Sequence, residues 1–170
     1  VVSSNSRAYA TSLGALVVMS LDFNGNILWK KKISTTSNYT NSRYIGINSQ
    51  GDIMVSGSNA INSAGIDDAY LMKLNPTNGA IIWSTTFGTN VNDHSYNVIE
   101  TDDGGYIYGA SSAFFGNGAN AKILIKVNSL GVFQWAKTYD NANDEAFRDY
   151  KIAPDGNIYL VGIEGSSGVF

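Results

Sequence analysis

The sequence predicts an all-β protein built from three tandem four-stranded antiparallel β-propeller blades, which together form an incomplete, open propeller. Two observations lead to this prediction. A short motif that ends in tryptophan recurs three times, and two glycine turns divide each copy into short runs of β-branched and aromatic residues. Four short strands per unit, repeated about every 50 residues, are typical of propeller blades.

The repeat is clearest at Trp29, Trp83 and Trp135, which lie 54 and 52 residues apart. Each tryptophan ends a Gly-x-apolar-x-Trp motif, whose glycines are Gly25, Gly79 and Gly131. An aromatic residue then marks the start of the next expected strand, and these residues are Tyr44, Tyr96 and Phe147. We expect the six aromatic side chains to fill the space between stacked sheets, since each can bury roughly 150–250 Å².

The four strands of each unit follow in a fixed order. The first is an apolar run, at residues 16–21, 70–74 and 123–127. A turn rich in Asn, Asp, Gly and Pro leads to the second strand, which carries the tryptophan, and these residue types favour turns. The third strand begins near the Tyr or Phe. A second glycine turn leads to the fourth strand, at residues 53–56, 106–108 and 158–161.

The repeat divides the chain into blades at residues 13–66, 67–118 and 119–170. Residues 1–12 are expected to be the tail of a preceding blade, because Val1-Val2-Ser3-Ser4 resembles the end of a fourth strand, and Val169-Phe170 resembles the start of a further one. No segment shows the 3.6-residue period of an amphipathic helix, so we expect essentially no helix. A β-solenoid is the alternative for repeated strands, but its repeats are usually shorter.

The second repeat carries a resemblance to a known family at residues 67–74, at Trp83, at Asn92-Asp93 and at residues 102–106. These residues are similar to the bacterial-type SBBP β-propeller repeat, and the third repeat matches at residues 143–147 and 154–159. The first repeat departs from the pattern. The resemblance implies a large secreted or surface protein and implies no particular reaction. The tryptophan strand also resembles the repeat of quinoproteins and their non-enzymatic relatives.

The composition excludes several classes of function. The 170 residues carry a net charge of −3, so there is no basic excess to bind a nucleic acid backbone. No run of about 18 apolar residues predicts a membrane span. The absence of cysteine excludes disulfides, thiolate metal sites and thiol nucleophiles.

Few residues are candidates for chemistry. The single histidine, His94, follows Asp93 and could act as a base or a ligand, but we expect it to be solvated in the connection between the second and third strands. The polar residues at this point of the three repeats are Asn41, Asp93 and Asp144. We expect their side chains to accept backbone N–H bonds and to hold a bend in the chain. Residues 140–145 are rich in oxygen donors and could alternatively bind calcium, although they do not match a calcium-binding loop.

One modification signal occurs in the sequence. Asn38-Tyr39-Thr40 is an Asn-x-Thr sequon in an expected exposed loop, which makes Asn38 a candidate glycosylation site.

Two hypotheses for the function follow. The first is a non-enzymatic extracellular or cell-surface structural or binding module, part of a larger repeat protein, fibril or assembly. Its partners would be the remaining blades or copies of itself, and surface proteins or glycans, with no cofactor and no metal. The alternative is a fragment of a propeller enzyme, either a quinoprotein-like dehydrogenase or a hydrolase, whose active site lies outside this segment. No catalytic constellation is visible in the sequence, and a function must be argued from a site.

Overall fold

The computed structural model describes residues 2–6, 15–33, 40–60, 67–112, 114, 121–139 and 145–164. Throughout these residues the chain forms β-strands joined by turns and loops, and contains no helix. The predicted all-β class is therefore confirmed. In the same residues no helix is long and apolar enough to cross a membrane.

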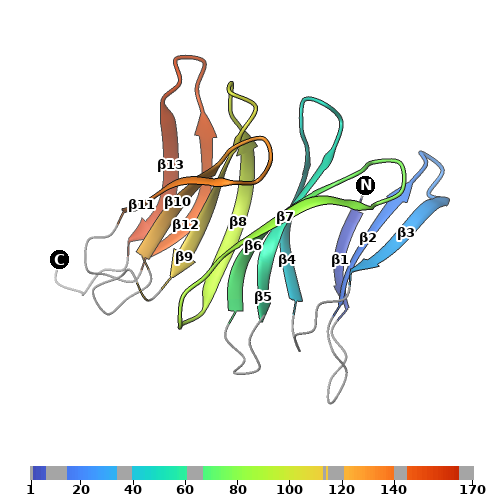
Figure 1. Ribbon diagram of the computed structural model, residues 1–170, viewed down its shortest axis with the longest axis horizontal. Helices are drawn as coiled ribbons and strands as arrows, with labels where there is room; N and C mark the ends of the chain where they lie inside the picture. Colours follow the sequence, from blue (N-terminus) through green and yellow to red (C-terminus); the bar gives the residue numbers. More distant parts are fainter. Residues whose placement is uncertain are drawn as a thin grey trace.

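The strands form four antiparallel sheets that stand side by side (Figure 1). Sheet I has the order β1 (Val2–Ser6), β2 (Ala15–Leu21) and β3 (Ile27–Ile33). Sheet II has the order β4 (Thr40–Ile47), β5 (Ile53–Ala60), β6 (Asp67–Leu74) and β7 (Ile81–Phe87).

Sheet III repeats the arrangement of sheet II with the next four strands. Its order is β8 (Asp93–Glu100), β9 (Tyr106–Ser112), β10 (Ala121–Val127) and β11 (Phe133–Tyr139). Sheet IV pairs β12 (Glu145–Ile152) with β13 (Ile158–Glu164). The core lies between the sheets.

The prediction of three four-stranded propeller blades is wrong. Among the described residues only sheets II and III have four strands, while sheets I and IV have three and two, and these sheets do not close into a ring (Figure 1). Each four-stranded sheet combines the last two strands of one sequence repeat with the first two of the next. The physical reason is burial. β6, β9 and β10 are buried along most of their length and lie mid-sheet, whereas the residues of the tryptophan strands β7 and β11 are exposed or half-buried, and these strands form edges.

Alternate side chains of the central strands point to opposite faces of each sheet, so that both faces of sheets II and III are buried. On β6, Tyr70 and Met72 pack against Leu16 and Val18 of sheet I. The intervening Leu71 of the same strand packs in a second cluster with residues of sheet III. Sheet III in turn packs its far face against Tyr150 of sheet IV.

The tryptophans of sheets I and II each rest on a glycine turn of the next sheet. The Trp29 indole Nε1 donates to the carbonyl oxygen of Pro76 at 2.9 Å, and Trp83 Nε1 donates to that of Ser129 at 3.1 Å. A Cβ added at Gly79 would lie 2.6 Å from the Trp29 ring, and one at Gly131 would lie 2.6 Å from the Trp83 ring. Both glycines also have positive φ angles, of 68° and 78°. Glycine is therefore required at these turns for two reasons, the closeness of the tryptophan ring and the positive φ angle.

We expect Trp83→Ala to lower the free energy of unfolding by about 3–5 kcal/mol, because it removes a large side chain that packs between sheets II and III. Trp135→Ala serves as the comparison, and its effect should be smaller, since no turn covers Trp135 within the described residues. Urea denaturation followed by circular dichroism measures both. A Trp83→Ala protein that melts within about 2 °C of the parent would contradict this assignment.

Candidate functional site

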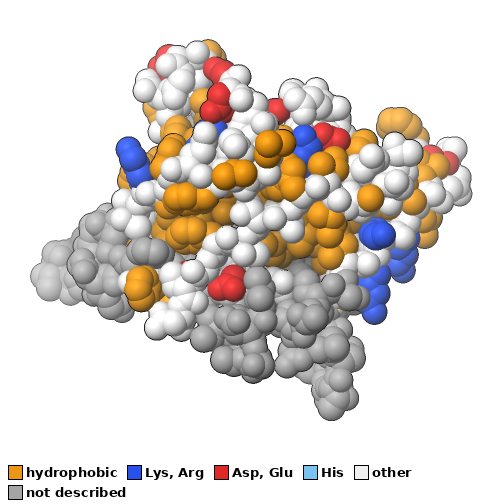
Figure 2. Space-filling model, viewed as in Figure 1, with side chains coloured by type: hydrophobic (Ala, Val, Ile, Leu, Met, Phe, Trp, Pro, Cys, Tyr) orange, Lys and Arg blue, Asp and Glu red, His pale blue; other side chains and the backbone are white. Residues whose placement is uncertain are grey.

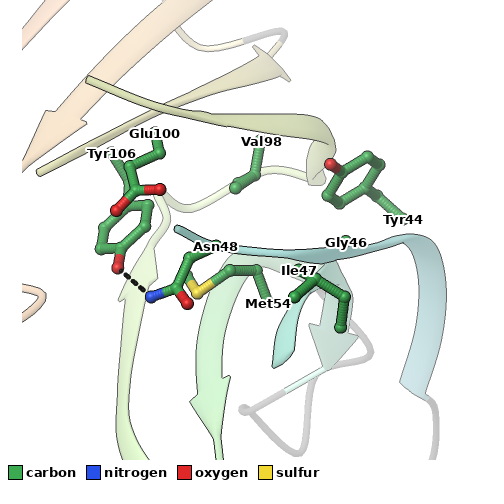
Figure 3. A pocket seen from close by; sticks show the side chains of 8 residues that line it. All are labelled: Tyr44, Gly46, Ile47, Asn48, Met54, Val98, Glu100 and Tyr106. Atoms are coloured by element: carbon green, nitrogen blue, oxygen red, sulfur yellow. Dashed lines mark hydrogen bonds between the residues drawn. The ribbon is translucent and has the colours of Figure 1, made fainter. Parts of the chain in front are cut away.

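The turns of sheets II and III meet over a small cavity, which we call the turn cavity (Figure 3). Its volume is about 20 Å³. It is lined by Tyr44, Gly46, Ile47, Asn48, Met54, Val98, Glu100 and Tyr106. This volume holds about one water molecule, whereas small-molecule sites span roughly 300–1,000 Å³. The turn cavity is therefore a seam between two sheets and too small for a substrate.

Polar groups around the turn cavity bind one another across the two sheets. The Asn48 side-chain amide donates to the Tyr106 hydroxyl at 2.9 Å, as drawn in Figure 3. Ser49 donates to the Glu100 carboxylate twice, from its backbone N–H at 2.6 Å and from its hydroxyl at 2.9 Å. The carboxylate of Glu100 is thus held by a neighbouring turn and fixes that turn in place.

A shallow depression of about 400 Å³ lies where the same two turns reach the surface. It is lined by Ser49, Gln50, Glu100, Thr101, Asp102 and Gly104. All six residues belong to the turns or their flanks, and Glu100 is already bound by Ser49. The depression presents polar groups without an apolar floor, which is unlike a typical ligand pocket.

Two buried lysines anchor these turns to the neighbouring strands. Lys73 forms an ion pair with Asp52 at 2.8 Å, and Lys126 forms one with Asp103 at 2.9 Å. Burial alone would lower the pKa of Lys73, but its hydrogen bond to Asp52 and nearby charges raise the pKa above its ordinary value. The carboxylate beside each lysine compensates its buried charge.

The Asp103 carboxylate is stabilised in its charged form. The Thr101 hydroxyl donates to it at 2.5 Å, and the Lys126 ammonium contacts both of its oxygens at 2.9 Å. These interactions, with the Gly105 N–H, lower the pKa of Asp103 well below its ordinary value. The group stabilises the turn as an anion.

A second group of titratable residues lies at the other end of the strands. It contains Asp67 and Asp68 at the start of β6, and Asp93 and His94 at the start of β8. Burial raises the pKa of Asp67 and of Asp68 and lowers the pKa of His94. The nearby Ser95 hydroxyl already donates to the backbone, to Gly57 O at 2.6 Å. The group therefore offers a histidine favoured in its neutral form but no free serine nucleophile.

The structure places His94 and its neighbours differently from the expectation of a solvated connection. His94 is partly buried on β8, and its Nδ1 has no hydrogen-bond partner among the described residues. Asp93 is fully buried, and its Oδ2 accepts the backbone N–H of Thr89 at 2.6 Å and the Thr89 hydroxyl at 2.8 Å. Asn41 lies on β4, while Asp144, Asn38 and residues 140–144 of the calcium candidate lie outside the described residues. No cluster of three or more His, Asp or Glu suited to a metal occurs among the residues that are described.

The aromatic residues of the repeat lie between the sheets where they are described. Tyr44 packs with sheets II and III, and Tyr96 and Trp135 pack with sheets III and IV. The Arg43 guanidinium lies 5.5 Å from the centre of the Tyr96 ring. Phe147 lies on β12, but its side chain falls outside what the structure describes. The turn glycine Gly25 has a positive φ of 84°, as do its counterparts in the other repeats.

Sequence reasoning missed Tyr150, a fully buried residue of β12 that joins sheets III and IV. Its hydroxyl donates to Asn97 O at 2.5 Å and accepts the Gly109 N–H at 2.8 Å. Burial raises the pKa of Tyr150 well above its ordinary value. No signal in the sequence separates this tyrosine from the exposed Tyr159, because both lie on expected strands.

Exposed apolar side chains recur on the outer edge strands of sheets I, II and III. We call them the outer apolar row: Ile27, Leu28, Ile81, Ile82, Val132 and Phe133, which are 45–65% exposed. Ile27, Ile81 and Phe133 hold the apolar position of the Gly-x-apolar-x-Trp motif, so the row follows the repeat. Figure 2 shows hydrophobic side chains gathered over the sheets, with few charges among them. Exposed apolar patches of this kind mark interaction surfaces.

Comparison with known proteins adds no assignment: no protein-family model matches the chain, and no curated protein matches its sequence.

We expect the contribution of Asp103 to stability to depend on pH. Because its pKa is lowered from 3.8 in the folded state, the stabilisation is complete above about pH 4–5 and is lost as the pH falls below 3.8. Asp103→Asn should cost about 1 kcal/mol or less at pH 7, since solvent screens this half-exposed group, and the cost should disappear in acid. Urea denaturation from pH 2 to 7 measures it. Asp102→Asn, which removes a neighbouring carboxylate with no ion pair among the described residues, should lack this pH dependence.

We expect Tyr150→Phe to lower the free energy of unfolding by about 1–3 kcal/mol, because the Gly109 N–H is left buried without an acceptor. Tyr159→Phe is the matched control, since Tyr159 is exposed and should change stability by less than about 0.5 kcal/mol. Equal effects of the two substitutions, measured by thermal and urea unfolding, would rule out the structural role given to Tyr150.

Proposed function

We propose that this protein is a non-enzymatic structural and binding module of a larger extracellular or cell-surface repeat protein, fibril or assembly. The outer apolar row carries the proposal, because it presents two exposed apolar residues per repeat along three successive sheets. Among the described residues, β3, β7 and β11 are edge strands of these sheets and offer unpaired backbone donors and acceptors to a partner.

The chemistry of the row favours protein over sugar as the contact. Its side chains, five aliphatic and one aromatic, offer no hydrogen bonds to sugar hydroxyls, whereas they complement the apolar core of a protein interface. The polar groups described above are already used, since Glu100 and Tyr150 bond to a neighbouring sheet and Lys126 bonds to Asp103 within sheet III. The resemblance of the repeat to that of secreted and surface proteins supports a location outside the cell.

We expect the outer apolar row to be covered by another polypeptide in the native assembly. Electron cryomicroscopy of the assembly isolated from its source tests this directly. A row that faces solvent throughout that assembly would refute the proposal.

A matched pair of variants tests the same surface in solution. The variant Ile27→Ser, Ile81→Ser, Phe133→Ser should fold normally, because all three residues are exposed, yet join the assembly about tenfold less well. The control Lys30→Ser, Thr86→Ser, Thr138→Ser changes exposed polar residues of the same three strands and should join it like the parent. Incorporation of fluorescently labelled protein into the assembly is the measurement.

A further inference from the structure

Within the described residues, β13 of sheet IV has one unpaired edge, whereas the corresponding strands of sheets II and III are paired on both sides. β5 lies between β4 and β6, and β9 lies between β8 and β10. Within the described residues, β13 pairs only with β12. Its outer edge therefore presents unpaired backbone N–H and C=O groups, which are a template for an added strand.

The apolar side chains of β13 correspond to side chains that are buried on β5 and β9. Leu160 occupies the same position after its turn glycine as Val55 on β5 and Tyr108 on β9. Val55 is 0% exposed and Tyr108 is 1% exposed, whereas Leu160 is 40% exposed. The exposed fraction differs because β6 flanks β5 and β10 flanks β9, whereas no such strand flanks β13 within the described residues.

Trp135 lacks the turn that covers the other two tryptophans. Trp29 and Trp83 each rest on a glycine turn of the next sheet and donate to a carbonyl oxygen there. In the described part of the chain, Trp135 has no such turn beneath its ring and no acceptor for its Nε1. The Lys137 ammonium lies 5.9 Å from the centre of the Trp135 ring. The ring is therefore placed to receive one more turn of the same kind.

Asp155 lacks the lysine that pairs with its counterpart. Asp155 and Asp103 hold the same position, directly before the glycine of their turns. Asp103 binds Lys126, which lies on the strand that pairs with β9. Asp155 binds only the N–H groups of Asn157, at 3.0 and 2.7 Å, and has no cationic partner among the described residues.

We propose that the β13 edge, Trp135 and Asp155 together form a docking site for a β-hairpin supplied from outside residues 1–170. The three features require a hairpin of the β10–β11 kind. Its first strand is apolar with a lysine opposite Tyr159, because Lys126 pairs with Ile107 at the equivalent position. Its turn has a glycine beneath the Trp135 ring and a free carbonyl oxygen for Nε1. The proposal rests on the assembly role proposed above and names the partner for one end of the module.

The hairpins within a second copy of this chain fit less well. The β2–β3 hairpin carries Ser20 where β6 and β10 carry Lys73 and Lys126, so it leaves Asp155 without a cation. Its first strand is already paired with β1. The β6–β7 and β10–β11 hairpins are paired within sheets II and III.

A synthetic peptide of residues 121–139, which spans the β10–β11 hairpin, tests the site in trans. Fluorescence anisotropy of the labelled peptide should show saturable binding to the full chain. Hydrogen exchange should show new protection of the β13 amides that do not bond to β12. A scrambled peptide of the same composition should do neither.

Charge exchange tests the role of Asp155. The Lys126→Ser peptide, which copies the β2–β3 hairpin at this position, should bind about fivefold more weakly. The Lys126→Glu peptide should bind Asp155→Lys protein better than it binds the parent protein. Asp102→Asn protein, altered at an exposed turn carboxylate of sheet III, should bind the original peptide like the parent.

A second substitution tests the role of Trp135. The Gly131→Val peptide should bind the parent protein more weakly, because a side chain at this position meets the tryptophan ring. The same substitution should matter less for Trp135→Ala protein, so the two changes should be coupled. Circular dichroism checks that the protein variants remain folded.

Three results would overturn the docking site. They are no binding of the peptide, binding that protects amides other than those of β13, or equal binding of the lysine and serine peptides. Concentration-dependent dimers of the chain that protect β13 without peptide would also overturn it, because the occupant would then be a second copy. None of these results bears on the outer apolar row, which lies on β3, β7 and β11, so the two proposals can fail separately.

Discussion

The whole structure depends on the covering of both faces of each small sheet. A four-stranded sheet such as sheet II has apolar side chains on both faces, because Tyr70 and Leu71 are consecutive on β6 and point in opposite directions. A single sheet leaves one or both of these faces in water, which costs free energy in proportion to the apolar area exposed. Stacking is therefore the condition for folding, and the tryptophan contacts between successive sheets set how neighbouring sheets lie against each other.

Burial of both faces also places polar groups in the interior, and contacts between sheets satisfy several of them. Tyr150 binds backbone atoms of sheet III from sheet IV. Asn48 of sheet II binds Tyr106 of sheet III, and Ser49 binds Glu100. Such bonds add little net free energy, but their loss leaves buried groups unpaired, and this favours one alignment of the sheets over others. The titratable groups near His94 include atoms with no partner in the described part of the chain, such as Asp93 Oδ1.

The strands and turns could be predicted from local residue pattern, whereas the sheets could not. Glycines such as Gly79 mark turns because of the backbone conformation they adopt, and the apolar runs mark strands. The strands recur along the chain with the same spacing, whichever strand is taken as the first of a sheet. The spacing therefore does not show with which strands β4 and β8 pair. The pairing of Lys126 with Asp103 was also hidden, because it joins residues 23 positions apart through the register of β9 and β10. In the sequence, the residues of the outer apolar row could be recognised only as positions of the motif. Their exposure to solvent follows from the structure.

The close approach of Trp83 to Gly131 has a consequence for the way such proteins change over generations. The contact uses only a tryptophan on one sheet and a glycine and a carbonyl oxygen on the next, and Trp29 makes the same contact at Gly79. Any unit with both parts fits before or after any other such unit. Duplication or deletion of a whole repeat therefore preserves this contact, so the number of units can vary while the tryptophan–glycine contacts between them stay the same.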